Sequence, residues 1–108
     1  MSCEGLEEMA SLFKAFSNPI RLKILALCAE REVSTRELRE KLGVSKPLLL
    51  AHIRKLLKAG LLESRLVIDE EKGRLVRLYR TANFEICVSR GFFRQLHLKS
   101  TCSSGEDV

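Results

Sequence analysis

The chain has 108 residues, of which 45% are hydrophobic and 31% charged, the composition of one folded domain rather than of a disordered chain. No apolar run approaches the roughly 18 residues of a membrane span. Acidic residues occupy the N-terminus, where a secretory signal would be basic. We therefore expect a soluble, cytoplasmic protein, and the scarcity of Asn and Gln beside Lys, Arg and Glu is typical of thermophiles.

The net charge of +5 is concentrated in one part of the chain. Residues 44–60 contain Lys46, Arg54, Lys55 and Lys58 and no acidic residue. A basic segment of this kind is typical of proteins that bind nucleic acid. A solvated helix face would have the same charge, so charge alone leaves both interpretations open.

The first 60 residues predict four helices. Apolar residues at helical spacing indicate a first helix over residues 5–16, and Asn18 followed by Pro19 is a typical start for a second, over 19–29. Ser34 and Glu37 form a capping box for a third helix that ends before Gly43. Ser45 caps a fourth helix that runs to Ala59, so the third and fourth helices form a helix-turn-helix.

The apolar period then changes from helical to alternating. Residues 62–68 and 74–80 alternate on either side of an acidic turn that ends in Gly73, which predicts a β-hairpin. Residues 84–88 alternate again and predict an extension of a strand. Ser89 is a candidate cap for a last helix, and residues 100–108 predict a frayed polar tail.

This order of elements, mainly α with a small β-hairpin wing, is that of a winged helix-turn-helix, which we expect to fill residues 1–99 as a single domain. Residues 12–25 (LFKAFSNPIRLKIL), 33–65 and 72–80 (KGRLVRLYR) resemble the ArsR-type transcriptional regulators. The resemblance implies a dimeric cytoplasmic protein that binds double-stranded DNA, usually a repressor that a small signal releases.

The fourth helix is the expected reading helix, because its N-terminal end offers free backbone donors and a positive dipole to phosphate. Lys46 is placed to reach a guanine edge, while Arg54, Lys55 and Lys58 are expected mainly on phosphates. His52 matches a histidine common in this helix of the family, although a packing role explains it equally well. The full set of candidate DNA-contacting residues is Ser45, Lys46, Leu48, Leu50, His52, Arg54, Lys55, Arg74 and Arg77.

Two features depart from the family pattern. Leu48 and Leu50 stand where family members usually have small polar residues, and they are expected to face outward, toward thymine methyl groups or a protein partner. Three acidic residues, 69–71, would be repelled by phosphate, so we expect the wing tip to stay in solvent.

The terminal helices carry more apolar residues than one core can use, which indicates a homodimer. Such a dimer would read an inverted repeat with half-sites one helical turn apart. The candidate interface residues are Leu6, Met9, Phe13, Phe92, Phe93 and Leu96.

The sequence does not identify an effector. The third helix has no Cys or His, and His97 has no partner one turn away, so no metal site or cofactor is expected. Thiol sensing is a further hypothesis for the four cysteines, Cys3, Cys28, Cys87 and Cys102.

Two other functions remain compatible with a winged helix. The first is a module that binds protein, which outward leucines and an acidic wing would favour. The second is a chromatin protein that binds any duplex. No catalytic constellation is discernible, so an enzyme is not expected.

Overall fold

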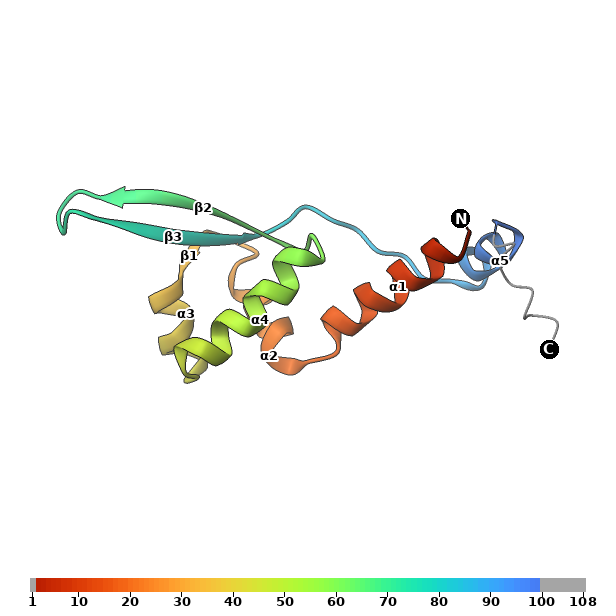
Figure 1. Cartoon of the computed structure of the whole chain (residues 1–108), viewed down its shortest axis with the longest axis horizontal. Helices are drawn as coiled ribbons and strands as arrows, with labels where there is room; N and C mark the ends of the chain where they lie inside the picture. The colour runs from red at the N-terminus through yellow and green to blue at the C-terminus, as the bar shows by residue number, and fades with distance from the viewer. Residues whose placement is uncertain (1, 100–108) are drawn as a thin grey trace. The chain divides into compact units, whose positions relative to one another are not determined.

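The computed structural model describes the backbone of residues 2–99 and the side chains of residues 5–96. Within this range the chain forms five helices and a three-stranded sheet (Figure 1). The helices are α1 (Ser2–Phe16), α2 (Pro19–Leu27), α3 (Thr35–Leu42), α4 (Lys46–Lys58) and α5 (Arg90–Lys99). The strands are β1 (Val33–Ser34), β2 (Leu62–Asp69) and β3 (Arg74–Thr81). The winged helix-turn-helix fold predicted from the sequence is confirmed.

The chain divides into two compact units. One comprises residues 15–83, which include the helix-turn-helix and the hairpin. The other contains α1 up to Lys14 together with the segment from Phe84 onward. Each unit is described separately below.

The predicted N-cap side chains are in place, but the capping box of α3 is only half formed, because the Glu37 carboxylate binds Arg31 instead of the Ser34 amide. The Asn18 side chain accepts a hydrogen bond from the Ile20 amide at 2.8 Å, and Ser34 accepts one from the Glu37 amide at 3.1 Å. Ser45 caps α4 in the same way. Gly43 ends α3 with a φ of 66°, a backbone conformation in which a side chain would be strained. Local chemistry therefore sets the limits of the helix-turn-helix.

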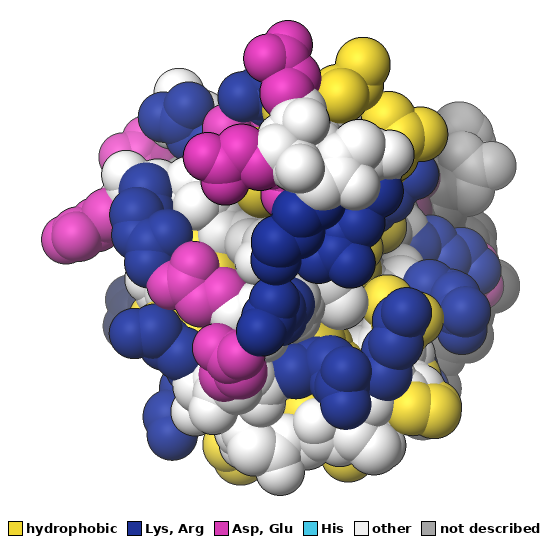
Figure 2. Space-filling model, turned by 90° about the vertical axis from the view of Figure 1, so that its left-hand side faces the viewer, with side chains coloured by type: hydrophobic (Ala, Val, Ile, Leu, Met, Phe, Trp, Pro, Cys, Tyr) yellow, Lys and Arg dark blue, Asp and Glu magenta, His cyan; other side chains and the backbone are white. Residues whose placement is uncertain are grey.

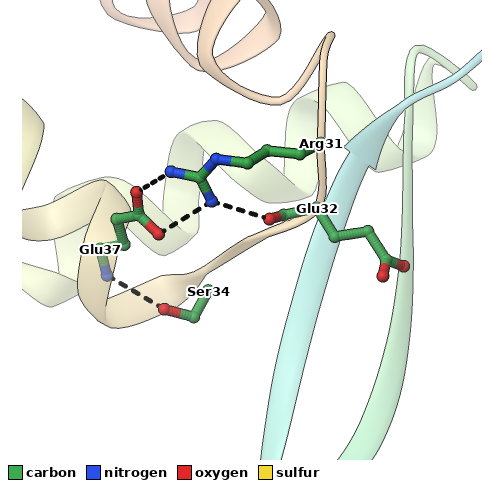
Figure 3. A network of polar contacts seen from close by, with 4 residues as sticks. All are labelled: Arg31, Glu32, Ser34 and Glu37. Carbon is green, nitrogen blue, oxygen red and sulfur yellow. Dashed lines mark hydrogen bonds and ion pairs between the residues drawn. The ribbon is translucent and has the colours of Figure 1, made fainter.

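A polar network fixes the approach to α3 (Figure 3). The Arg31 guanidinium donates to the Glu37 carboxylate and to the Glu32 carbonyl oxygen. The Glu32 carboxylate in turn accepts hydrogen bonds from Arg65 of β2 at 2.5 and 2.7 Å. These arginines hold the pKa of both carboxyl groups below their usual values. Because the ion pairs are exposed, their main effect is on the geometry between α3 and the wing.

The core of the larger unit lies between α2, α3 and α4. Leu38 of α3 is fully buried with Leu49, Ile53 and Leu56 of α4, as the apolar spacing predicts. Tyr79 of β3 is buried as well, and the Thr81 hydroxyl donates a 2.7 Å hydrogen bond to the Leu25 carbonyl oxygen. The base of the hairpin is thus anchored on the helices.

The sheet has the order β1-β3-β2, with all neighbours antiparallel. The register of the hairpin runs from Leu62 opposite Thr81 to Asp69 opposite Arg74. In the turn, the Asp69 carboxylate accepts from the amides of Glu71 and Lys72. Because β1 pairs only with residues 78–79, the outer half of the hairpin is a two-stranded ribbon.

Two of the predicted boundaries are corrected. The strand expected over residues 84–88 is wrong, because β3 ends at Thr81, opposite the first residue of β2, so the segment beyond has no strand to pair with. The helix expected over residues 19–29 ends at Leu27, where Cys28 becomes the C-cap.

A buried polar contact joins α2 to α4. Arg21 of α2 is only 8% exposed, and its Nε donates to the carbonyl oxygen of Ala15 in the last turn of α1 at 2.8 Å. Its Nη1 lies 3.0 Å from Nδ1 of His52, which is 9% exposed. Since a guanidinium can only donate, Nδ1 is the acceptor and the imidazole is neutral.

We predict that this neutral imidazole makes stability depend on pH. Burial, then the positive charges of Arg21 and Lys55, lower the pKa of His52 in the folded protein. In the unfolded chain the pKa returns to about 6.5, so the unfolded state binds more protons below that pH. The free energy of unfolding should therefore fall as the pH drops below about 6.5, by at most about 1.4 kcal/mol per pH unit from this group.

The measurement is denaturant unfolding between pH 5 and 8, with His52→Gln as the control. Glutamine can still accept from Arg21 but does not titrate, so the variant should show a shallower decline. Identical pH dependence in both proteins would contradict a neutral, buried His52.

Candidate nucleic-acid interface

The exposed face of α4 begins at its N-terminus. Ser45, Lys46 and Leu48 are exposed in the first turn, whereas Leu49 and Ile53 pack inward. The first amides of a helix have no partner within the helix, so this end attracts anions. The amphipathic pattern of α4 therefore presents a cationic, anion-attracting end to solvent.

A groove of about 550 Å³ connects α4 to the wing. It brings together Lys46 and Leu50 of α4 with Arg74 and Arg77 of β3, four of the predicted DNA-contacting residues. Its lining also contains Arg36, Arg39 and Lys72, against one acidic residue, Asp69. Figure 2 faces the end of the molecule that carries the wing turn and α3, and shows Lys and Arg side chains gathered across it with acidic side chains beside them. The positive charge of this groove therefore suits a polyanionic ligand.

Sequence reasoning missed the two arginines of α3. Arg36 and Arg39 are three residues apart and so share one helix face. Arg36 pairs with one of the acidic residues of α3, Glu40, at 3.3 Å. These acidic residues keep the net charge of the segment small, so the charge distribution along the sequence does not reveal the two arginines. Their spacing on the third helix was the signal that could have identified them.

The other predicted residues lie outside this groove. Leu48, Arg54 and Lys55 are exposed on α4, and Ser45 caps the helix. His52 is buried against Arg21, so of its two expected roles its position supports packing and not contact with DNA. We do not retain His52 among the DNA-contacting candidates.

In the wing turn, the acidic residues differ in environment. The Asp69 carboxylate is engaged by two backbone amides and shapes the turn. Glu70 and Glu71 are exposed at its tip. On the strand behind them, Arg77 donates a 3.1 Å hydrogen bond to the Ser64 hydroxyl. The negative charge of the turn therefore lies at the end of the hairpin, beyond the arginines.

The smaller unit has a groove of its own, of about 430 Å³, between α1 and the segment that leads into α5. Met9, Phe13 and Phe92 line it, and these are predicted interface residues. Leu6 and Phe93 are exposed and Leu96 is half-buried. The predicted interface thus leaves apolar side chains accessible on a single chain.

The two cysteines with described side chains have contrasting environments. Cys28 is completely buried, and burial raises the pKa of its thiol to about 11. Cys87 is exposed and borders the groove of the smaller unit. The side chains of Cys3 and Cys102 lie outside the described part. Since the thiolate is the reactive form, Cys28 is poorly suited to sensing.

Among the described residues, no group of three His, Cys, Asp or Glu side chains is arranged to hold a metal ion. Over the same range no helix combines the length and apolarity needed to cross a membrane.

Comparison with known proteins identifies the family. Residues 16–65 match a family described as a helix-turn-helix domain. The chain is 35% identical over 91 residues to an uncharacterized HTH-type transcriptional regulator of the archaeon Methanocaldococcus jannaschii, covering 84% of this chain and 94% of that protein. This chain belongs to the helix-turn-helix transcriptional regulators. Members of this class bind DNA and are not typically enzymes.

Two further likenesses refine this result. A biofilm growth-associated repressor of Xylella fastidiosa is 34% identical over 58 residues, 54% of this chain and 51% of the repressor. The solution structure of a homodimeric winged helix-turn-helix DNA-binding domain from Mycobacterium bovis, described as a possible ArsR-family regulator, superposes with a TM-score of 0.64. It is 25% identical, with 89% of this chain and 78% of that one covered. The ArsR-type resemblance of the sequence is confirmed.

We predict a large difference in reactivity between the two described cysteines. At pH 8 a thiol with a pKa of about 11 is roughly 0.1% thiolate, so Cys28 should be alkylated by iodoacetamide at least ten-fold more slowly than Cys87. Peptide-resolved mass spectrometry measures both rates in one sample. In denaturant the difference should vanish, and equal rates in the native protein would show that Cys28 is accessible.

Proposed function

We propose that this regulator is a cytoplasmic homodimeric repressor that reads an inverted repeat in double-stranded DNA with α4. The observation that supports this most is the groove in which cations from α3, α4 and the wing surround the exposed start of α4. Cations drawn from three separate elements and facing one concavity suit a phosphate backbone.

In this proposal α4 enters the major groove with its N-terminal turn nearest the bases. Lys46 would contact a guanine edge, and Leu48 and Leu50 would contact thymine methyl groups. Arg54 and Lys55 would hold phosphates. The arginines around the groove would do the same: Arg36, Arg39, Arg74 and Arg77. Ser45, at the start of α4, would lie closest to the DNA backbone.

Dimerisation is proposed through the terminal helices. Leu6, Phe13 and Phe93 are exposed, and burial of such side chains between two copies would be favourable. The Mycobacterium bovis domain is a homodimer, which supports the same assembly here. Two reading helices would then meet half-sites about 34 Å apart, one turn of the duplex. The repressor named among the relatives supports repression as the outcome.

A protein-binding module is the second candidate, and the exposure of Leu48 on the reading helix favours it. Substitution of Lys46 decides between the two candidates, because a protein-binding role does not require this lysine.

We predict that Lys46→Ala weakens binding to DNA roughly ten-fold and lowers the slope of log affinity against log salt by about 1. Lys23→Ala, an exposed lysine of α2, is the matched control and should change affinity less than two-fold. The measurement is fluorescence anisotropy on duplex DNA from upstream of the protein's own gene, with random duplex as competitor. Sedimentation equilibrium of the same samples should give a mass near twice the 12.3 kDa of one chain.

Binding that random duplex removes equally well would replace the repressor with a sequence-independent chromatin protein. If neither duplex binds at low salt, or if the lysine variants bind alike, α4 is not the reading helix.

A further inference from the structure

One of the side chains that hold α4 in the core can change its charge near neutral pH. The helix buries Leu49, His52, Ile53 and Leu56. Among these only the histidine titrates, and the ordinary pKa of its side chain is about 6.5. A proton taken up by His52 would therefore act on the packing of the helix that is proposed to read DNA.

The contact between His52 and Arg21 exists only while the imidazole ring is neutral. Nη1 of Arg21 lies 3.0 Å from Nδ1 of His52, and a guanidinium has no acceptor. Nδ1 must therefore carry the lone pair, which places the ring proton on Nε2. Protonation of Nδ1 would set one N–H against another and add a second positive charge beside the first, so the two side chains could not keep this geometry.

The charges around His52 oppose its protonation. Arg21 of α2 and Lys55 of α4 itself are both cations, and together with burial they lower the pKa of the ring. The end of α1 meets this site through the Ala15 carbonyl oxygen, which is uncharged. The other elements that pack on α4 are α3 and β2, and within the described chain neither contributes a charge that acts on this ring. The site therefore stabilises the neutral ring and not the imidazolium.

Side chains proposed to contact DNA lie on the same part of α4. Leu50 precedes His52 by two residues, and Arg54 and Lys55 follow it by two and three. Because backbone hydrogen bonds hold a helix together, a movement of His52 away from Arg21 would carry these side chains with it. Hydrogen bonds to phosphates and bases hold only within about 3.2 Å, so a small displacement of α4 is enough to lose them.

From this arrangement we propose that the contact between Arg21 and His52 positions α4 for DNA, and that protonation of His52 breaks the contact and weakens binding. This inference rests on the proposed function. DNA would bind the form in which the ring is neutral and α4 is seated on α2. Because coupling between two ligands is reciprocal, bound DNA would in turn lower the pKa of His52.

The direction of this effect separates it from ordinary surface electrostatics. Acidification makes a protein surface more positive, which strengthens binding to phosphates. A nearby phosphate also raises the pKa of a histidine, because it favours the charged form of the ring. The contact with Arg21 predicts the reverse for both the affinity and the pKa.

Fluorescence anisotropy on the duplex from upstream of the protein's own gene, at constant ionic strength between pH 5.5 and 8, measures the affinity. For the parent protein the affinity should fall roughly three- to ten-fold from pH 7.5 to pH 5.5, because one coupled proton limits the change to ten-fold per pH unit. His52→Gln should abolish this fall, since its side-chain oxygen still accepts from Arg21 and does not titrate. His97→Gln removes the other histidine of the chain, in α5, and is the matched control that should keep the fall.

Two further measurements examine the contact itself. His52→Leu cannot accept from Arg21 and should bind at pH 8 no better than the parent at pH 5.5. Nitrogen-15 signals of the imidazole ring should show a proton on Nε2 in the free protein and a lower pKa of His52 once DNA is bound. The ring signals need no variant, so the test survives if a substitution folds poorly, and circular dichroism monitors the fold at each pH.

Four results would overturn the inference. If the affinity of the parent stays constant or rises toward pH 5.5, or if DNA raises the pKa of His52, the contact does not control α4, while the proposed function stands. An equal fall in His52→Gln would assign the pH effect to another group. A loss of helical signal that parallels the loss of affinity would assign it to unfolding of the whole protein. If the parent binds no duplex at pH 8, the proposed function fails, and this inference fails with it.

Discussion

The arrangement of the larger unit depends on one buried guanidinium. The Arg21 guanidinium is buried, so its donors need acceptors, and the fold supplies them from the end of α1 and from α4. The Ala15 carbonyl oxygen and the neutral His52 ring satisfy part of its donors at 2.8 and 3.0 Å. A buried donor that loses its acceptor costs about 1–3 kcal/mol. The contact therefore holds α4 against α2 and the end of α1.

With its inner face held in this way, α4 must present its other face to solvent. Leu49, Ile53 and Leu56 complete the core from α4, and Lys46 and Leu50 border the groove. The same reasoning applies to the wing, whose base is anchored and whose outer half is free. Cations of α3, α4 and β3 line one groove because α4 and the hairpin both extend past the core that supports them.

The elements and their caps were predictable because their causes are local. Ser34, Ser45 and Gly43 each act within one turn of their own position, and short-range spacing reveals them. The partnership of Arg21 with His52 joins positions 31 residues apart, and no pattern in one sequence indicates such a contact. Alternation at residues 84–88 predicted a strand, but pairing depends on a neighbour, and β2 begins too late to supply one. Arg36 and Arg39 join the site only through the packing of α3 beside the wing.

Binding of DNA by α4 and the wing is tested by titrating the nitrogen-15-labelled protein with duplex DNA from upstream of its own gene and following the amide chemical shifts. If α4 and the wing bind DNA as proposed, the largest changes occur at residues 36–39, 46–50 and 74–77, with small changes along α2. Changes concentrated at residues 6–13 and 84–93, with none around the groove, would contradict this mode of binding.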